Sequence, residues 1–225
     1  MNHRILSFSL FLAVLNAPAS SVHAATNGFV LPSFRGSANS EAGYWETFTV
    51  PFGSPGNLPD RPGATTGAVL TQQNTNAFLT GSGNLYNPTE LSSFTLTDTT
   101  PFALGTVVLQ ARSLGSELDY SAIALNYTDA LGAHSLAPQY RLELARSAAT
   151  GMNVSSLWQW DLRNLGVNDY TITFAAAAPS LSFDSMTLDT WNQFAVVPEP
   201  TTIVLGALGA SGFLLCRAGK RRRSA

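Results

Sequence analysis

The sequence is poor in the residues that carry most protein chemistry. Its 225 residues include one cysteine and three histidines, and only 12% of them are charged. A single cysteine excludes a disulfide within the chain, and it excludes zinc and iron–sulfur sites that use several cysteines. Apolar residues make up 45% of the chain, which is enough for one globular core at this length.

Positive charge is scarce in the middle of the chain and concentrated at its end. Between residues 25 and 197, six arginines and no lysine stand against thirteen acidic residues, a net charge of −7. Five of the twelve basic residues lie within residues 217–223. This distribution argues against a protein that binds nucleic acid through a basic patch.

Catalytic motifs are absent from the sequence. It contains no G-x-S-x-G, H-E-x-x-H, Walker A or G-x-G-x-x-G pattern. His134 is the single histidine between residues 25 and 197, and its surroundings predict a solvated loop, although composition leaves a Ser-His-Asp triad open. Glycoside hydrolysis needs only two carboxyl groups. The available acids are Glu41, Glu46, Glu117, Asp119, Glu143, Asp161, Asp184 and Asp189, and such scattered acids are typical of a soluble surface.

The first 24 residues have the layout of a removable secretory signal peptide. His3 and Arg4 precede an apolar run over residues 5–15, which is too short to span a bilayer comfortably. Small residues follow, so signal peptidase is expected to cut between Ala24 and Ala25. The alternative is a buried N-terminal helix.

The last 28 residues fall into three parts of different chemistry. Pro198-Glu199-Pro200 comes first, and the sixteen residues 201–216 that follow carry no charge. As a helix they would measure about 24 Å, which spans a bilayer if flanking arginines snorkel and the lipid thins. The basic tail 217–225 should stay cytoplasmic, because positive flanks are retained on that side. Its membrane-retaining residues are Arg217, Lys220, Arg221, Arg222 and Arg223.

This order of motif, short apolar helix and basic cluster resembles the PEP-CTERM sorting signal. The resemblance covers about the last 28 residues, and Pro198, Glu199 and Pro200 match the motif itself. It implies that an exosortase, an intramembrane cysteine protease, recognises the motif and processes the anchor. It also implies a bacterial surface protein linked to extracellular polysaccharide and biofilm. The alternative is an ordinary single-pass anchor that is never cut.

The pattern of residues 25–194 predicts one exported domain made of short strands. Apolar and polar residues alternate with a period of two in several runs, for example Tyr140–Leu144 and Asp169–Phe174. Turn residues separate these runs, and a long Gly- and Pro-rich loop is expected over 51–66. The further predicted strands are 44–50, 68–72, 77–80, 93–97, 106–111, 120–127, 154–162, 180–183 and 185–189.

About ten such strands predict an all-β fold, an antiparallel β-sandwich of the jelly-roll type. A short helix around 144–149 is weakly indicated. Trp45 and Trp191 lie near the ends of the domain, where terminal strands of a jelly roll often pair, so the two indoles are expected to pack together. Residues 195–200 form the expected tether to the membrane helix.

Two features of the body suggest ligands. Trp158 and Trp160 are two residues apart on a predicted strand and therefore share one face. They form a sugar-stacking platform if that face meets solvent, and part of the core if it does not. The oxygen-rich stretches 164–169 and 184–189 could contribute to a structural calcium site, although neither matches a calcium-binding loop.

Three hypotheses follow for the function. The first is a non-catalytic structural or carbohydrate-binding sandwich that is exported and sorted to the cell surface or matrix. The second is a carbohydrate-active hydrolytic exoenzyme on the same route, and the third is a plain membrane-anchored domain. The expected partners are signal peptidase, exosortase, the membrane through the C-terminal helix and an extracellular polysaccharide, with no cofactor other than the calcium considered above.

Overall fold

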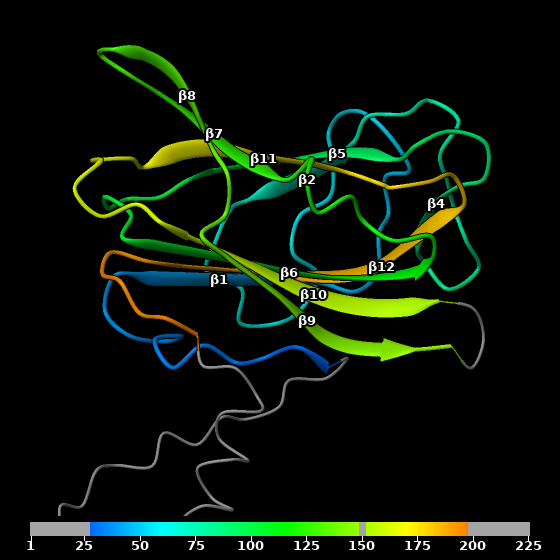
Figure 1. The fold of residues 1–225 in the computed structure, drawn as a ribbon, viewed down its shortest axis with the longest axis horizontal. Coiled ribbons are helices and arrows are strands. Elements are labelled where there is room, and N and C mark those ends of the chain that lie inside the picture. The colour runs from blue at the N-terminus through cyan, green and yellow to red at the C-terminus, as the bar shows by residue number, and fades with distance from the viewer. Residues whose placement is uncertain (1–27, 149–151, 198–225) are drawn as a thin grey trace, which may run out of the picture.

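A computed structural model describes residues 28–148 and 152–197 of the chain. These residues form an all-β structure of two antiparallel sheets with no α-helix in the described part, as the alternating sequence pattern predicts (Figure 1). The predicted signal peptide, sorting motif, membrane helix and basic tail lie outside the described residues.

The described residues form twelve strands. Their bounds are β1 (Ser40–Trp45), β2 (Val69–Gln72), β3 (Phe78–Leu79), β4 (Leu85–Asn87), β5 (Ser93–Thr99), β6 (Thr106–Gly115), β7 (Ala124–Asp129), β8 (Gly132–Leu136), β9 (Tyr140–Ser147), β10 (Asn153–Asp161), β11 (Asp169–Ala175) and β12 (Leu181–Trp191).

The strands are divided between a larger and a smaller sheet that face each other (Figure 1). The seven-stranded sheet has the order β3-β4-β12-β6-β10-β9, and β1 also pairs with β12. The five-stranded sheet has the order β2-β5-β11-β7-β8. Beyond the sandwich, the β7–β8 hairpin projects from one end of the smaller sheet (Figure 1).

The main core fills the space between the two sheets. On β11 the side chains of Tyr170, Ile172 and Phe174 are buried, and they alternate with more exposed residues as a half-buried strand requires. The ring of Phe174 stacks on Phe94 of β5 at 5.0 Å, and Phe94 meets Phe183 of β12 at 4.7 Å. Aromatic contacts therefore join strands of both sheets.

The outer face of the seven-stranded sheet is covered as well. A second apolar cluster there comprises Val30, Phe34, Val108, Leu157 and Val197, so both ends of the described chain pack on this face. This second cover explains why β10 is buried on both faces and shows no simple alternation.

Two buried glutamines attach these terminal segments to the sheet. Gln110 of β6 accepts a hydrogen bond from the N–H of Val30 at 2.7 Å and donates to the Val30 carbonyl at 2.9 Å. Gln159 of β10 donates to the Ala195 carbonyl at 2.6 Å and accepts from the N–H of Val197 at 3.2 Å. Each amide thus supplies the donor and acceptor that a neighbouring strand would supply.

Most predicted strands are present, with informative differences. The predicted runs 180–183 and 185–189 form the single strand β12, which continues through an irregularity between Phe183 and Ser185. The predicted helix at 144–149 is wrong as far as Ser147, because β9 continues to that residue and pairs with β10. The predicted strand 44–50 is correct only at Tyr44 and Trp45, because β1 covers Ser40–Trp45 and residues 46–50 form no strand. Neither β4 nor β8 was predicted from the sequence.

Trp45 and Trp191 do not pack together. Their strands do pair, but Trp45 lies opposite Met186 and Trp191 lies opposite Ser40, at the two ends of the ladder. Trp45 enters the main core, whereas Trp191 stacks on Phe34 at 5.3 Å in the outer cluster. The pairing of β1 with β12 was therefore expected correctly, but the register of an antiparallel pair decides which residues lie opposite each other, and here it separates the two tryptophans.

Candidate functional site

The sugar-stacking platform predicted from two tryptophans is wrong. Trp158 and Trp160 are both 0% exposed and belong to the core between the sheets. The indole of Trp160 donates to the Leu136 carbonyl at 3.0 Å, and Trp158 contacts the ring of Tyr120 at 5.5 Å. The alternative interpretation of these residues as core is therefore confirmed, because β10 is an interior strand whose inner face meets the second sheet.

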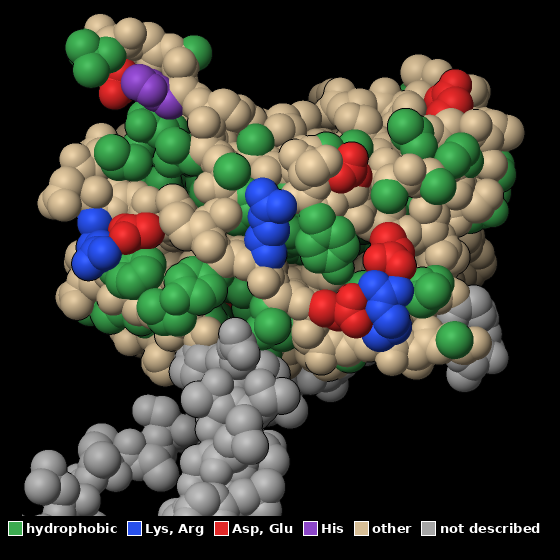
Figure 2. Space-filling view, viewed as in Figure 1, with side chains coloured by type: hydrophobic (Ala, Val, Ile, Leu, Met, Phe, Trp, Pro, Cys, Tyr) green, Lys and Arg blue, Asp and Glu red, His purple; other side chains and the backbone are tan. Residues whose placement is uncertain are grey.

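Most of the acids considered as catalytic pairs are bound to arginine. Figure 2 shows arginine and acidic side chains side by side on the surface. The pairs are Arg35–Asp189, Arg61–Glu46, Arg112–Asp184, Arg163–Asp161 and Arg146 with both Glu117 and Glu143. Asp119 accepts hydrogen bonds from Ser121 instead. Asp189 is buried, whereas the other pairs lie on the protein surface.

Glu41 and Asp98 differ from the other acids. Asp98 of β5 is buried and accepts hydrogen bonds from the hydroxyls of Thr66 and Tyr170, each at 3.0 Å. Burial raises the pKa of Asp98 although these hydrogen bonds oppose the rise. Burial also raises the pKa of Glu41, with a smaller contribution from the charge of Asp98. Neither carboxyl forms an ion pair within the described residues.

Glu41 lies on a surface hollow of about 410 Å³ beside β1. Arg35, Tyr44 and Arg61 line the same hollow, and the guanidinium of Arg61 lies 4.4 Å from the ring centre of Tyr44. The Oε2 atom of Glu41 points away from solvent and has no hydrogen-bond partner. Glu41 was among the acids considered from the sequence, but Asp98, which lies on the opposite sheet, was not.

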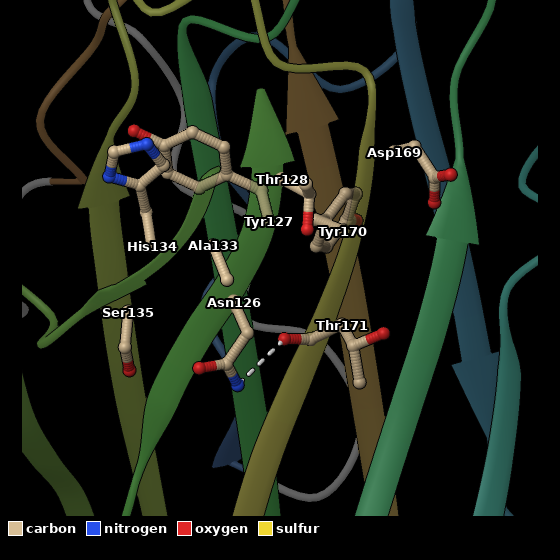
Figure 3. Close-up of a pocket in the computed structure, with 9 residues that line it drawn as sticks. All are labelled: Asn126, Tyr127, Thr128, Ala133, His134, Ser135, Asp169, Tyr170 and Thr171. Carbon is tan, nitrogen blue, oxygen red and sulfur yellow. Dashed lines mark hydrogen bonds between the residues drawn. The ribbon is translucent and has the colours of Figure 1, made fainter. Parts of the chain in front are cut away.

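A second hollow of about 410 Å³ lies beside the projecting hairpin. The pairing of β7 with β11 covers only Ala124–Asn126, so the two strands separate beyond Asn126. The side-chain amide of Asn126 donates to the Thr171 carbonyl at 3.3 Å (Figure 3). Polar side chains from both strands and the ring of Tyr127 line the gap.

His134 lies at this hollow, on a strand that the sequence analysis took for a loop. Its ring stacks on Tyr127 at 4.8 Å, and its Nε2 lies 2.9 Å from the carboxylate of Asp129 (Figure 3 shows the two rings). The contact with His134 lowers the pKa of Asp129. Asp129 pairs with Gly132 at the turn of this hairpin, and β8 has only five residues without a buried face.

A third hollow, of about 630 Å³, is lined by Tyr120, Arg141 and Glu117 among others. The ring of Tyr120 packs on Trp158, and its hydroxyl contacts Ser156. Within the described residues, Arg141 alone among the arginines forms no ion pair.

The calcium-binding stretches predicted from the sequence show no metal-binding group. Within residues 28–148 and 152–197, no cluster of three or more histidine, cysteine, aspartate or glutamate side chains has a metal-binding arrangement. In the stretch 184–189 both acids face arginines, Asp184 at 3.5 Å from Arg112 and Asp189 at 2.5 Å from Arg35. Calcium binding at these stretches stays a prediction.

The remaining predicted site residues fall outside the described part of the chain. They are the cleavage site at Ala24 and Ala25, the motif Pro198-Glu199-Pro200 and the basic cluster Arg217 to Arg223. Among the residues that the structure does describe, no helix has the length and apolar character needed to cross a membrane.

Comparison with known proteins adds little. No protein-family model and no curated protein sequence matches the chain. Among solved structures, the enzymatically active domain of tailspike protein 4 from bacteriophage CBA120 is similar over 67% of this chain and 18% of that chain, with 11% identity. Its TM-score is 0.27, too low to support any argument about the fold or the activity of this chain.

Proposed function

We propose that the chain is an exported bacterial surface protein whose C-terminal signal is recognised by an exosortase. The observation that carries this proposal is the order Pro198-Glu199-Pro200, sixteen uncharged residues and a basic tail, which follows a body that is preceded by a predicted signal peptide. Processing would pass the body from the inner membrane to the cell surface or the extracellular polysaccharide.

The end of the folded body fits this role. Val197 is 8% exposed and is held to the sheet through Gln159, so the ordered body reaches to the residue before the motif. The predicted tether over 195–200 is therefore shorter, because residues 195–197 pack on the sheet. A protease that recognises the motif would work directly beside the sandwich.

We also propose a jelly-roll arrangement for the body. Eight of the strands have the orders β1-β12-β6-β10 and β5-β11-β7-β8 in the two sheets. Connections between β5, β6 and β7, and later between β10, β11 and β12, pass from one sheet to the other. Jelly rolls combine two Greek keys in this way and include lectin domains, which supports a binding role by analogy of fold.

The body then serves as a non-catalytic structural or carbohydrate-binding module. The hollow beside the projecting hairpin favours carbohydrate binding, since it joins an aromatic pair to hydroxyl, amide and carboxylate groups. A glycan array with the detergent-solubilised full chain separates the two roles: specific binding assigns the body to carbohydrate recognition, and its absence assigns a structural role.

The sorting proposal is tested by changing both prolines of the motif. In a host that contains an exosortase, Pro198→Ala with Pro200→Ala should leave an uncut precursor in the membrane. Alanine frees the backbone angle that proline fixes and restores an N–H, so the shape of the motif is lost.

The matched control replaces the exposed prolines of the body, Pro62→Ala with Pro101→Ala, and should be processed like the unchanged chain. Mass spectrometry of the C-terminus reports processing. The same mature C-terminus in the motif variant and the unchanged chain would refute exosortase sorting.

A further inference from the structure

Three buried oxygen atoms without a hydrogen-bond partner occur where β1 meets the end of β12. They are Oε2 of Glu41, Oγ1 of Thr190 and Oδ1 of Asn192. Thr190 is 0% exposed, so its hydroxyl has no access to bulk water. Buried polar atoms are normally hydrogen-bonded, and three exceptions in one place indicate a ligand with positive character.

The register of the strands directs these atoms toward the space between the sheets. Met186 and Leu188 of β12 belong to the main core, and Thr190 follows in the same alternation. Glu41 is the cross-strand partner of Thr190 and shares its face. The N–H of Asn192 donates to the Asn39 carbonyl at 3.1 Å, which extends the ladder by one more pair.

Asp98 approaches the same place from the opposite sheet. Thr66 lies between the two sheets. Its hydroxyl donates to Asp98 at 3.0 Å. Its methyl group packs closely on Gly43 of β1, since a Cβ atom added to Gly43 would lie only 2.7 Å from it. Gly43 is two residues from Glu41 and has the same orientation on β1. Glu41 and Asp98 therefore face one another across the end of the sandwich.

The two carboxyl groups lack a compensating charge. Arg35 and Arg61 line the hollow next to Glu41, but Arg35 binds Asp189 and Arg61 binds Glu46. Asp98 accepts hydrogen bonds from the hydroxyls of Thr66 and Tyr170 and from the backbone N–H of Thr99, which are all neutral donors. Two partly desolvated carboxylates without a counter-ion are costly, so a cation would relieve both.

We propose that a calcium ion binds between Glu41 and Asp98, with Thr190 and Asn192 as further oxygen ligands. Carboxylate, hydroxyl and amide oxygens suit a hard cation, and calcium accepts six to eight of them in irregular geometry. One divalent ion neutralises the two carboxylates. The hollow beside Glu41 admits the ion and the waters that complete its coordination. This site is distinct from the calcium-binding stretches that the sequence predicted.

Thermal unfolding of the full chain in detergent tests the site. After treatment with a chelator, 10 mM calcium chloride should raise Tm by about 3 to 10 °C, on the basis of the affinities of extracellular calcium modules. Magnesium chloride should raise it less, because magnesium demands a smaller octahedral site. Glu41→Gln should abolish the calcium response.

Two variants make the result interpretable. Glu90→Gln removes an exposed loop carboxylate outside the site and should respond to calcium like the unchanged chain. Thr190→Val keeps the shape of the side chain, removes one ligand and should weaken calcium binding about tenfold in titration calorimetry, by analogy with metal-site substitutions. Thr190→Val also keeps the test valid if Glu41→Gln fails to fold.

The stability and calcium response of Glu41→Gln distinguish a bound cation from a shared proton. In chelator at pH 8, folded Glu41→Gln should be at least as stable as the unchanged chain, since it removes an uncompensated charge. An unchanged Tm and no binding heat with calcium would overturn the proposal and leave a proton shared by the two carboxyls as the explanation. An equal calcium response in Glu41→Gln would also overturn it.

Discussion

Arg35 shows how one side chain can support a buried charge. Its guanidinium donates to both carboxylate oxygens of Asp189, at 2.5 and 2.6 Å, on the outer face of the seven-stranded sheet. Burial raises the pKa of Asp189, and the hydrogen bonds and charge of Arg35 oppose that rise. Removing one partner of a buried pair is much more costly than removing one of an exposed pair.

We expect Arg35→Ala to lower the free energy of unfolding at pH 7 by about 3 kcal/mol. Without Arg35 the pKa of Asp189 rises further above its unfolded value, so the native state favours the protonated carboxyl. The loss should therefore be large at pH 7 and smaller at about pH 4, where Asp189 is protonated. Urea unfolding at the two pH values measures it.

The control for this prediction removes both charges. Arg35→Met with Asp189→Leu replaces the pair by apolar side chains of similar size and should restore most of the stability at pH 7. A loss for Arg35→Ala that is greater at acidic than at neutral pH would contradict the assignment of a buried carboxylate dependent on Arg35.

Trp158 and Trp160 mark the limit of prediction for single residues. Their spacing correctly places them on one face of a strand, because side chains alternate along any strand. Spacing does not tell which face meets the second sheet. The sequence likewise does not tell which arginine an acidic residue will bind. Asp189, for example, binds Arg35, which is 154 positions away in the chain.

At the scale of elements, the glutamine clamps hold segments that have little regular structure of their own. Gln159 provides both hydrogen bonds that join residues 195–197 to β10, and these residues belong to no strand. The chain directly before the proposed sorting motif is therefore held by this amide, together with the hydrogen bond from the N–H of Ala195 to Thr106 at 3.3 Å and the apolar contacts of Val197.

Gln159→Leu should release this segment while the sandwich stays folded. The change leaves the Ala195 carbonyl and the Val197 N–H without partners, and we expect a cost of about 1–3 kcal/mol. Hydrogen exchange at Val197 should become faster, and limited proteolysis near residue 195 should increase. Gln73→Leu, at an exposed position, is the matched control and should change neither. Unaltered protection of Val197 in Gln159→Leu would contradict the clamp.

The strands differ in how well local pattern predicted them. Those with alternating apolar residues, such as β11, were correctly located from the sequence because one face is buried and the other is not. The pattern failed for β8, whose residues are all partly or fully exposed on the projecting hairpin. It also failed at the end of β9, where pairing with β10 extends the strand to Ser147 against the local preference.

At the scale of the whole molecule, the two ends of the described chain lie on one face of the sandwich (Figure 1). An N-terminal signal peptide and a C-terminal membrane helix would therefore attach the precursor to the bilayer from the same side. This arrangement is consistent with a body that folds outside the cytoplasm while its tail is still anchored.

We expect this topology in cells that lack an exosortase. N-terminal sequencing should begin at Ala25, and a reporter fused after Ala225 should resist protease added from outside, because the arginine cluster is retained in the cytoplasm. The body of the same fusion should be accessible to that protease. A mature chain that starts at Met1, or a reporter degraded from outside, would contradict the proposed export.

The sequence by itself determined the all-β class and most strand positions, because these depend on local pattern and length. The signal peptide and the sorting signal at the two ends stay predictions. The tertiary structure alone decided which faces are buried, and it moved Trp158 and Trp160 from a hypothetical surface into the core. It also brought Glu41 and Asp98 together. The two lie on different sheets and 57 positions apart, and only the packing of one sheet on the other places Glu41 within the electrostatic influence of Asp98.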